Sequence, residues 1–528
     1  MSNLIEGLVP PDIQPLGEVC RRNAARWPEN VAMWDGERQI TWHELDRNAA
    51  RVAHGLAALG VQPGHRVAAI GRTSIEMFEL VHGTAWLGAV FTGINWRLNP
   101  GEVAYIVNDS EAQVLFVDEH MLQSVLSVRE QLHRIKAICV LGSAAPEGTF
   151  AYEEWRNAQM DNPINRRIDP AEPTTQVYTS GTTGRPKGAV LSHRYWMAAA
   201  ELNAAQRHDS YGMKVGEVIL HHFPMFHIGG VGLHYYPAIR GGGIAILKEY
   251  NTGEVLRLMA KHRVPLLYGV PTMFQDLLND ERFPQADFSN VRYCGYGAAP
   301  MPIALRDRLM KIVPCMFVQR YGMTESAFVT TLDPEDHLGD VVKAKSVGRP
   351  LVGVEVRILD SDGDELPTGK AGEVAIRTPL MMDGYWKLPD ETRKAFRDGW
   401  YMTGDGGYLD GDGYLFLTDR IKDLIISGGE NISSIEIENV LYEHPSVLKV
   451  AVVAAPDERW GEVPKAFIVV KSGQEFSPES LHAFAATRLG KYKLPKYYEE
   501  IDELPLNASG KILKRELRTL GNEHAVRV

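Results

Sequence analysis

The chain of 528 residues has few cysteines, and their spacing forms no pairing pattern. The four are Cys20, Cys139, Cys294 and Cys315, far apart in sequence. Zinc sites and small disulfide-stapled folds use closely and regularly spaced cysteines. We therefore expect neither a structural zinc ion nor a disulfide framework, and we expect a reducing environment.

A long uninterrupted hydrophobic run is also lacking. The most apolar stretch, residues 77–96, contains Glu79, His82 and several glycines, whereas a membrane span needs about 20 predominantly apolar residues. It predicts a buried helix followed by a strand, and no membrane span. Residues 1–15 lack the basic segment and apolar core of a secretory signal, and residues 525–528 form no peroxisomal address. We expect a cytoplasmic protein.

An excess of basic residues is lacking as well. The formal net charge is −11, whereas nucleic-acid-binding proteins usually present a basic face. We therefore expect no nucleic-acid partner. The chain is 45% hydrophobic and 23% charged, which is ordinary for globular proteins. At about 150 residues per domain, the length predicts two to four folding units.

The most informative stretch is a loop rich in Gly, Ser and Thr, residues 178–188, which follows a short β-prone segment. Glycines let backbone N–H groups turn inward, and successive N–H groups form a nest for anions. Lys187 adds a mobile positive charge. The loop is not a Walker A motif, because Lys187 follows Pro186 and precedes Gly188. It predicts a cradle for a polyphosphate; the alternative is a flexible surface loop.

The pattern of apolar residues indicates several structural blocks. Residues 34–41 predict a β-hairpin around an Asp-Gly turn, followed by a helix that opens with a Thr41/Glu44 capping box. Alternating strands and helices predict a largely parallel sheet covered on both faces before residue 118, and a second α/β set over residues 218–320. Residues 347–414 alternate apolar and polar side chains, which predicts antiparallel strands in a small barrel or sandwich.

Two further motifs follow predicted strands in the second α/β set. Residues 223–230 combine aromatic, proline and glycine residues around His227; on its own, this histidine is interpreted as a core residue. Residues 295–300 carry small side chains that would let a planar ring approach the backbone closely. The alternative for that segment is a tight strand–helix turn.

Residues 319–325 end on Thr324 and Glu325. A hydroxyl beside a carboxylate suits a phosphate–magnesium site, because Mg²⁺ takes one or two carboxylates together with phosphate oxygens. The alternative is a helix N-terminus, with Thr324 as cap and Glu325 favouring the dipole. Both interpretations can hold together.

Three later segments are unremarkable when each is considered alone. Asp405 lies in a turn, where aspartate is common. Residues 419–431 open with alternating charges and would ordinarily form a solvated linker at a domain boundary. Lys511 lies in a predicted loop before a basic helix, where a lysine is ordinarily solvated.

Taken in order, these motifs resemble those of the adenylate-forming superfamily, which contains acyl-CoA synthetases, peptide-synthetase adenylation domains and firefly luciferase. The resemblance covers essentially the whole chain and is strongest to the acyl-CoA synthetases. It implies an α/β protein: a large N-terminal domain, residues 1–420, of two α/β lobes plus a small β-barrel, and a smaller, mobile α+β C-terminal domain, residues 421–528. It also implies ATP, Mg²⁺ and coenzyme A as cofactors.

The resemblance assigns nucleotide, hinge and coenzyme A contacts residue by residue. The phosphate loop contributes Thr179, Ser180, Gly181, Thr182, Thr183, Gly184 and Lys187. Further nucleotide contacts are Gly297, Ala298, Ala299, Tyr321, Gly322, Met323, Asp405 and Arg420, with Tyr296 as a candidate stacking face for adenine. The hinge pivot is Lys422, and the loop bordering the pantetheine channel is Ser427, Gly428, Gly429 and Glu430.

Catalytic roles are implied by the same resemblance. Lys511 would enter the site only in the adenylating conformation and bridge the substrate carboxylate and the α-phosphate. Thr324 would contact the α-phosphate, Glu325 would hold Mg²⁺, and His227 would gate the acyl pocket. Asp405 would accept hydrogen bonds from the ribose hydroxyls. The candidate pocket walls are Ile228, Gly229, Gly230, Val270 and Met323.

The function implied is ATP-dependent ligation of a fatty or aromatic carboxylic acid to coenzyme A. One alternative is a stand-alone adenylation enzyme that loads a carrier protein, and a luciferase-like oxidase shares the same motifs. A non-catalytic nucleotide sensor is the alternative from a different class, and we expect such a sensor to have lost Lys511, Glu325 or Asp405, all of which are present. The sequence leaves the oligomeric state open; homodimers are the commonest soluble assembly.

Overall fold

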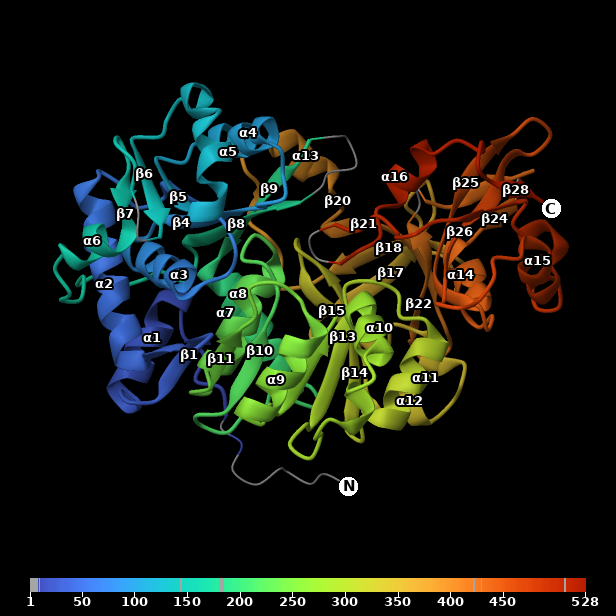
Figure 1. The fold of residues 1–528 in the computed structure, drawn as a ribbon, viewed down its shortest axis with the longest axis horizontal. Helices are drawn as coiled ribbons and strands as arrows, with labels where there is room; N and C mark the ends of the chain where they lie inside the picture. The colour runs from blue at the N-terminus through green and yellow to red at the C-terminus, as the bar shows by residue number, and fades with distance from the viewer. Residues whose placement is uncertain are drawn as a thin grey trace.

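The structure is a computed structural model that describes residue 8 and residues 10–142, 145–179, 185–420, 423–428, 430–507 and 510–528. Seven residues assigned from the sequence lie outside this description: Ser180, Gly181, Thr182, Thr183, Gly184, Lys422 and Gly429. Figure 1 shows a broad body formed by the blue-to-yellow part of the chain. The red C-terminal part lies at one side of this body.

The first lobe is built on an eight-stranded sheet in the order β19-β9-β8-β4-β3-β5-β6-β7. Its parallel strands are β3 (Arg66–Ile70), β4 (Val90–Ile94), β5 (Val114–Asp118), β6 (Ala137–Leu141), β7 (Phe150–Ala151) and β8 (Pro173–Thr179). Two antiparallel strands complete it, β9 (Lys187–Ser192) and β19 (Gly384–Tyr385). The parallel sheet predicted for this region is therefore confirmed.

Helices cover both faces of this sheet, as predicted. Val67 and Ala69 of β3 pack in one core with α2 (Trp42–Ala58) and α3 (Ile75–Leu87), whereas the alternate residues Ala68 and Ile70 pack in another core with α4 (Pro100–Ser110) and α5 (Leu122–Leu126). The two-residue period of a strand places neighbouring side chains on opposite faces. Further helices of this part of the chain are α1 (Leu16–Arg26), α6 (Tyr152–Asn157) and α7 (His193–Ala204).

The second lobe contains two sheets. One has the order β10-β11-β1-β2, with strands β10 (Val218–His221), β11 (Gly243–Ile246), β1 (Val31–Asp35) and β2 (Arg38–Thr41). The other has the order β12-β13-β14-β15-β16, with strands β12 (Leu266–Gly269), β13 (Tyr293–Gly297), β14 (Met316–Met323), β15 (Ala327–Leu332) and β16 (Arg349–Pro350). Helices of this lobe are α8 (Ile228–Ala238), α9 (Thr252–His262), α10 (Pro271–Asn279), α11 (Ile303–Ile312) and α12 (Pro334–Leu338).

The hairpin predicted at residues 34–41 forms, but its sheet is set by a distant partner. Met33 of β1 pairs in parallel with Ile244 of β11, more than 200 positions further along the chain. The N-terminal hairpin therefore extends a sheet of the second lobe. The helix after it begins with the predicted capping box between Thr41 and Glu44.

The strands predicted within residues 347–414 are antiparallel, as expected. They are β17 (Glu355–Leu359), β18 (Gly372–Arg377), β20 (Phe396–Arg397) and β21 (Trp400–Leu409), joined by β22 (Leu415–Arg420). Among the described strands the pairing is that of an open sheet with β22 beside β21, and no pairing closes it into the expected small barrel. Short helix α13 (Pro389–Lys394) precedes β20.

The C-terminal part has its own sheet and its own core, in agreement with the predicted α+β domain. Its strands are β23 (Ile425–Ser427), β24 (Glu430–Ile432), β25 (Val447–Asp457), β26 (Gly461–Val470), β27 (Tyr497–Glu500) and β28 (Val526–Arg527). Its helices are α14 (Ser434–Tyr442), α15 (Pro478–Ala486) and α16 (Lys514–Thr519). The division between residues 420 and 421 stays a prediction. Within the described ranges, no helix combines the length and apolar character needed to cross a bilayer.

Position 348 requires glycine. It lies just before β16 and contacts both Thr331 of β15 and Leu415 of β22. Gly348 has φ +85°, and a Cβ atom there would lie 1.9 Å from the carbonyl oxygen of Thr331. Its own carbonyl accepts a hydrogen bond of 2.8 Å from the amide of Leu415. Both the backbone angle and the contact exclude a side chain at this position.

We predict that Gly348→Ala destabilises the N-terminal domain by about 2–4 kcal/mol, because left-handed strain adds to a backbone clash. Gly369→Ala is the matched control: it has φ +81° but open space around its Cβ position, so a cost of about 1 kcal/mol is expected. Scanning calorimetry of the two variants measures the difference. Equal melting temperatures for both would show that the contact with Thr331 relaxes without cost.

Candidate active site

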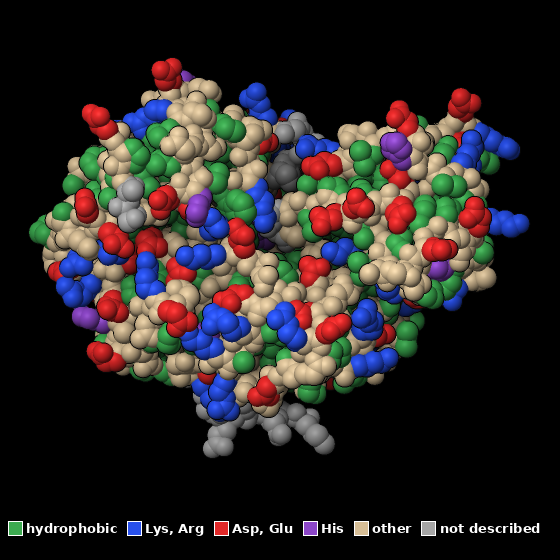
Figure 2. Space-filling view, viewed as in Figure 1, with side chains coloured by type: hydrophobic (Ala, Val, Ile, Leu, Met, Phe, Trp, Pro, Cys, Tyr) green, Lys and Arg blue, Asp and Glu red, His purple; other side chains and the backbone are tan. Residues whose placement is uncertain are grey.

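Residues that are far apart in sequence converge where the two domains meet. Asp405 lies on β21 and pairs in register with Arg420 at the end of β22. Glu325 follows β14, and Lys511 lies in the loop before α16 of the C-terminal part. Figure 2 shows the surface hollowed between the first lobe and the C-terminal domain in the same view.

The carboxylate of Asp405 is held from two sides. The hydroxyl of Tyr321 donates to Oδ2 at 2.6 Å, and Arg420 Nε lies 3.5 Å from Oδ1. Burial raises the pKa of the Asp405 carboxyl above its ordinary value, while the Tyr321 hydroxyl and the charges of Arg420 and Lys511 oppose that rise. A carboxylate fixed in this way is suited to accept hydrogen bonds from paired hydroxyl groups.

Lys511 is a half-buried cation among charges of both signs. Its pKa falls from 10.5 to about 8, because burial and the nearby charge of Arg420 disfavour the ammonium form; Asp405 and Glu325 act in the opposite direction. Its backbone is fixed by Asn507, whose side chain accepts from the Lys511 amide at 2.9 Å and whose amide donates to the Lys511 carbonyl at 2.8 Å. The structure therefore brings Lys511 together with Asp405, Glu325 and Arg420.

Thr324 and Glu325 lie in a tight turn between two strands. Strand β14 ends at Met323 and β15 begins at Ala327, so the interpretation of this segment as a helix N-terminus is wrong. The Thr324 carbonyl accepts from the Tyr195 hydroxyl at 2.8 Å, and the Glu325 carboxylate accepts from the Tyr385 hydroxyl at 2.8 Å. Both residues are almost completely buried.

This turn fits a magnesium–phosphate site. A hydroxyl and a carboxylate are oxygen donors, which Mg²⁺ prefers, and Mg²⁺ commonly takes its remaining ligands from water and substrate phosphates. Among the described residues, no group of three or more His, Cys, Asp or Glu side chains could hold a metal ion on its own. An ion bound here would therefore depend on Glu325 and on the phosphates of a nucleotide.

The described residues at the edges of the phosphate loop are Thr179, which ends β8, and Lys187, which begins β9. Lys187 Nζ lies 2.5 Å from an oxygen of Glu391 in α13 and 5.2 Å from the centre of the Tyr385 ring. Tyr385 thus touches both Lys187 and Glu325. We did not predict Tyr385 or Glu391, since both reach the site through the long-range pairing of β19 with β9.

His227 caps the N-terminus of α8. Its Nδ1 accepts from the amide of Gly229 at 3.1 Å, so the neutral ring carries its proton on Nε2. Burial and the charge of Lys511 lower the pKa of His227 to about 3, so the ring stays neutral at physiological pH. A side chain at Gly230 would lie 2.3 Å from the carbonyl oxygen of Pro224, which makes this turn dependent on glycine.

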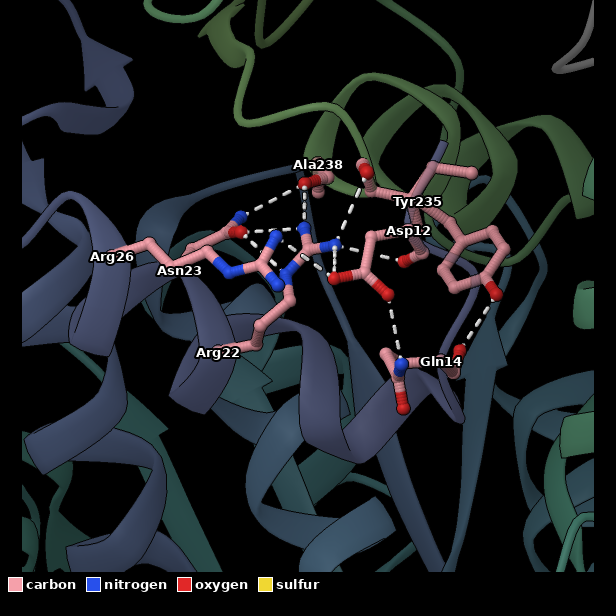
Figure 3. A network of polar contacts seen from close by, with 8 residues as sticks. Asp12, Gln14, Arg22, Asn23, Arg26, Tyr235 and Ala238 are labelled. Atoms are coloured by element: carbon pink, nitrogen blue, oxygen red, sulfur yellow. Dashed lines mark hydrogen bonds and ion pairs between the residues drawn. The ribbon is translucent and has the colours of Figure 1, made fainter. Parts of the chain in front are cut away.

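The other end of α8 is held by the N-terminal segment (Figure 3). Arg22 and Asn23 of α1 donate to the Ala238 carbonyl at 2.9 and 2.8 Å. Asp12 pairs with Arg22 at 3.3 Å, and the Tyr235 hydroxyl donates to the Gln14 carbonyl at 2.7 Å. Cationic donors at a helix C-terminus satisfy its free carbonyls and favour its dipole. This network fixes the helix that carries His227.

The small-residue turn predicted for adenine follows β13. A Cβ at Gly297 would lie 2.2 Å from the Arg320 carbonyl oxygen, and Ala298 adopts φ +65°. The interpretation of Tyr296 as a stacking face is wrong. Its ring is buried in the core beneath the sheet, and its hydroxyl bonds to His337 Nε2 at 2.9 Å. The aromatic ring beside Asp405 is that of Tyr321.

The loop assigned to the pantetheine channel forms the β23–β24 hairpin, where Ser427 pairs with Glu430. Gly428 has φ +58°, and its amide donates to the carbonyl of Trp460 at 2.8 Å. The strand pairing of Ser427 with Gly461 and the bond from Gly428 join this hairpin to β26 and the turn before it in the same domain.

Comparison with known proteins agrees with this arrangement. Residues 20–386 match the family model of AMP-binding enzymes, and residues 436–511 match that of the AMP-binding enzyme C-terminal domain. The chain is 38% identical over 514 residues to the fatty acid–[acyl-carrier-protein] ligase ScoC of Streptomyces coeruleorubidus, which covers 96% of each chain. It is 37% identical over 507 residues to a feruloyl-CoA synthase of an Amycolatopsis species, covering 96% of this chain and 99% of that protein.

Solved structures are similar over nearly the whole chain. The anthranilate CoA ligase AuaEII in complex with anthranoyl-AMP aligns with a TM-score of 0.88 at 27% identity, covering 97% of this chain and 98% of that one. The o-succinylbenzoate CoA synthetase MenE of Bacillus subtilis, in complex with its acyl-adenylate intermediate, aligns with a TM-score of 0.83 at 30% identity, covering 96% and 99%.

The depressed pKa of Lys511 has a consequence for stability. Below pH 8 the lysine is charged in both the folded and the unfolded chain, so the cost of burying the ammonium is fully present. Between pH 8 and 10.5 the unfolded chain binds more protons, so the stability of the wild type rises with pH through this group. We predict that Lys511→Met stabilises the protein by about 1–2 kcal/mol at pH 7.

The gain of Lys511→Met over wild type should shrink as the pH is raised from 7 to 9.5. Thermal unfolding of both proteins across this range measures it, with Lys514→Met as control, because Lys514 pairs with Glu438 and its pKa is raised instead. A pH-independent difference for Lys511→Met would contradict the burial of a charged lysine at this site.

Proposed function

Since this chain belongs to the AMP-binding enzyme family, whose model matches residues 20–386, we propose that it is an AMP-forming acid–thiol ligase that joins a carboxylic acid to coenzyme A. Relatives whose names describe acid–CoA ligases match nearly the whole chain. The observation that supports the proposal is that Lys511, from the C-terminal domain, is close enough to Glu325 and Asp405 for their charges to act on its pKa.

In the first half-reaction the substrate carboxylate attacks the α-phosphorus of ATP, the bond to the β-phosphate oxygen breaks, and pyrophosphate leaves. Lys511 lies between the carboxylate and the α-phosphate and stabilises the negative charge that develops there. Lys187 and Thr324 contact phosphate oxygens, and Asp405 accepts from the ribose hydroxyls. Glu325 would hold Mg²⁺, which would neutralise phosphate charge.

In the second half-reaction the thiol of coenzyme A loses its proton to solvent and attacks the acyl carbonyl carbon. The bond between that carbon and the phosphate oxygen of AMP breaks, and AMP leaves as this oxygen keeps the electron pair. The β23–β24 hairpin pairs with β26 of its own domain, where Ser427 lies opposite Gly461. We propose that the domain of residues 421–528 turns about Lys422, which withdraws Lys511 and presents Ser427 and Glu430 to the thiol. Hinges of this kind need only a few residues that change backbone angles.

The proposed acid is fatty or aromatic. Candidate pocket walls that the structure describes are Ile228, Gly229, Gly230, Val270 and Met323, of which all are apolar. Relatives include a feruloyl-CoA synthase and an indoleacetate–CoA ligase as well as a fatty acid ligase. All four cysteines are free, which supports a cytoplasmic location; a homodimer also remains part of the proposal.

A second candidate is loading of a carrier protein in place of free coenzyme A. It is favoured by the fatty acid–[acyl-carrier-protein] ligase at 38% identity. Supplying purified acyl-adenylate together with either coenzyme A or a phosphopantetheinylated carrier protein separates the two. The mass of the thioester product identifies the acceptor.

We predict that the wild type exchanges labelled pyrophosphate into ATP in the presence of a suitable fatty or aromatic acid and Mg²⁺. Lys511→Ala should reduce this exchange by about 100-fold or more, because it removes a charge that acts in the transition state. It should spare thioester formation from supplied acyl-adenylate. Equal loss of both half-reactions would contradict the role of Lys511, and no exchange with any acid of a broad panel would contradict the function.

A further inference from the structure

Helix α10 carries contacts to the C-terminal domain that none of the sequence motifs indicates. Thr272 and Asp276 of this helix each touch a different element beyond residue 421. Because they are four residues apart, their side chains lie on one face of the helix. The same helix follows Val270, a candidate wall of the acyl pocket.

The first contact holds the residue before Lys511. The Thr272 hydroxyl donates to the Gly510 carbonyl at 3.0 Å. Gly510 has φ +81°, and a Cβ there would lie 2.9 Å from Thr272 Oγ1 and 3.0 Å from Val270 Cγ2. The backbone of the lysine loop is therefore in close contact with the first turn of α10.

The hydroxyl of Thr272 bonds to the C-terminal domain, although it lies at the start of a helix without a side-chain cap. Pro271 opens α10 and has no N–H group, and Val270 at the N-cap position makes no side-chain cap. Threonine near a helix start commonly bonds to its own helix. Here the hydroxyl bonds to the other domain instead, which indicates a role in docking.

The second contact is electrostatic. Lys449 Nζ of β25 lies 3.2 Å from Asp276 Oδ1, and their side chains are 25% and 42% exposed. Tyr442 of α14 packs beside this pair, against the core around α10 as well as against the core of its own domain. Partly exposed ion pairs contribute little on their own, so this contact can be broken and remade in each catalytic cycle.

We propose that this face of α10 is the docking surface for the C-terminal domain during adenylation. Thr272 and Asp276 would then be positioning residues for Lys511. The inference rests on the proposed function. A lysine side chain is long and flexible, and a displacement of about 1 Å at a reacting group can cost a large part of the rate. Holding the backbone of Gly510 in place fixes the position of the neighbouring Lys511 Cα atom, from which the lysine side chain extends.

The test separates the two half-reactions. Thr272→Val keeps the shape of the side chain but removes the donor, so pyrophosphate exchange should fall about five- to ten-fold, while thioester formation from supplied acyl-adenylate stays unchanged. Thr272→Ser keeps the donor and should restore exchange. A role in folding alone would slow both half-reactions and lower the melting temperature.

The ion pair is tested by a double-mutant cycle. Asp276→Asn and Lys449→Gln should each slow exchange about two- to three-fold, and the double variant should be no slower than either single one, because both remove the same contact. Glu281→Gln is the matched control, an exposed acid just beyond α10, and should leave exchange unchanged. Additive losses for the pair would overturn its role in docking.

Amide hydrogen exchange provides a readout that does not need turnover. In the protein without substrates, Thr272→Val should accelerate hydrogen exchange at the backbone amides of Gly510 and Lys511, and Thr272→Ser should not. If the wild type exchanges pyrophosphate but Thr272→Val changes neither pyrophosphate exchange nor amide hydrogen exchange, the inference about α10 is overturned while the proposed function stands. Absence of wild-type pyrophosphate exchange would overturn the proposed function, and hydrogen exchange would still decide whether Thr272 anchors the loop.

Discussion

The site depends on a single electrostatic arrangement: an ammonium group from one domain inserted beside carboxylates of another. Lys511 shares its surroundings with Asp405, Glu325 and Arg420. Burial disfavours its charge, and the carboxylates partly restore it. The position of the C-terminal domain and the charge of the site are therefore linked, because Lys511 is present only where that domain is docked.

The neighbouring groups are arranged so that few charges are left uncompensated. Tyr321 and Tyr385 donate to Asp405 and Glu325 at 2.6 and 2.8 Å, and Lys187 pairs with Glu391. His227 stays neutral because burial and Lys511 lower its pKa. Buried charges are tolerated where they are paired or hydrogen-bonded, and here the tyrosine hydroxyls meet much of that requirement.

Local patterns predicted many of the elements but not their partners. The Thr41/Glu44 capping box and the helix followed by a strand within residues 77–96 formed as predicted, since they depend on neighbouring residues. The sheet joined by the N-terminal hairpin, the burial of Tyr296 and the approach of Tyr385 to Glu325 were not predicted. Each results from a contact between segments tens to hundreds of residues apart, which no local periodicity encodes.

The sequence by itself determined the order of the motifs, the alternation of strands and helices, and the residue types at Asp405, Glu325 and Lys511. Only the tertiary structure decided which of these side chains lie together, which tyrosine faces the site, and that α10 receives the lysine loop. The physical reason is that chain order constrains local backbone geometry, whereas burial, pKa values and docking contacts depend on the packing of distant surfaces against one another.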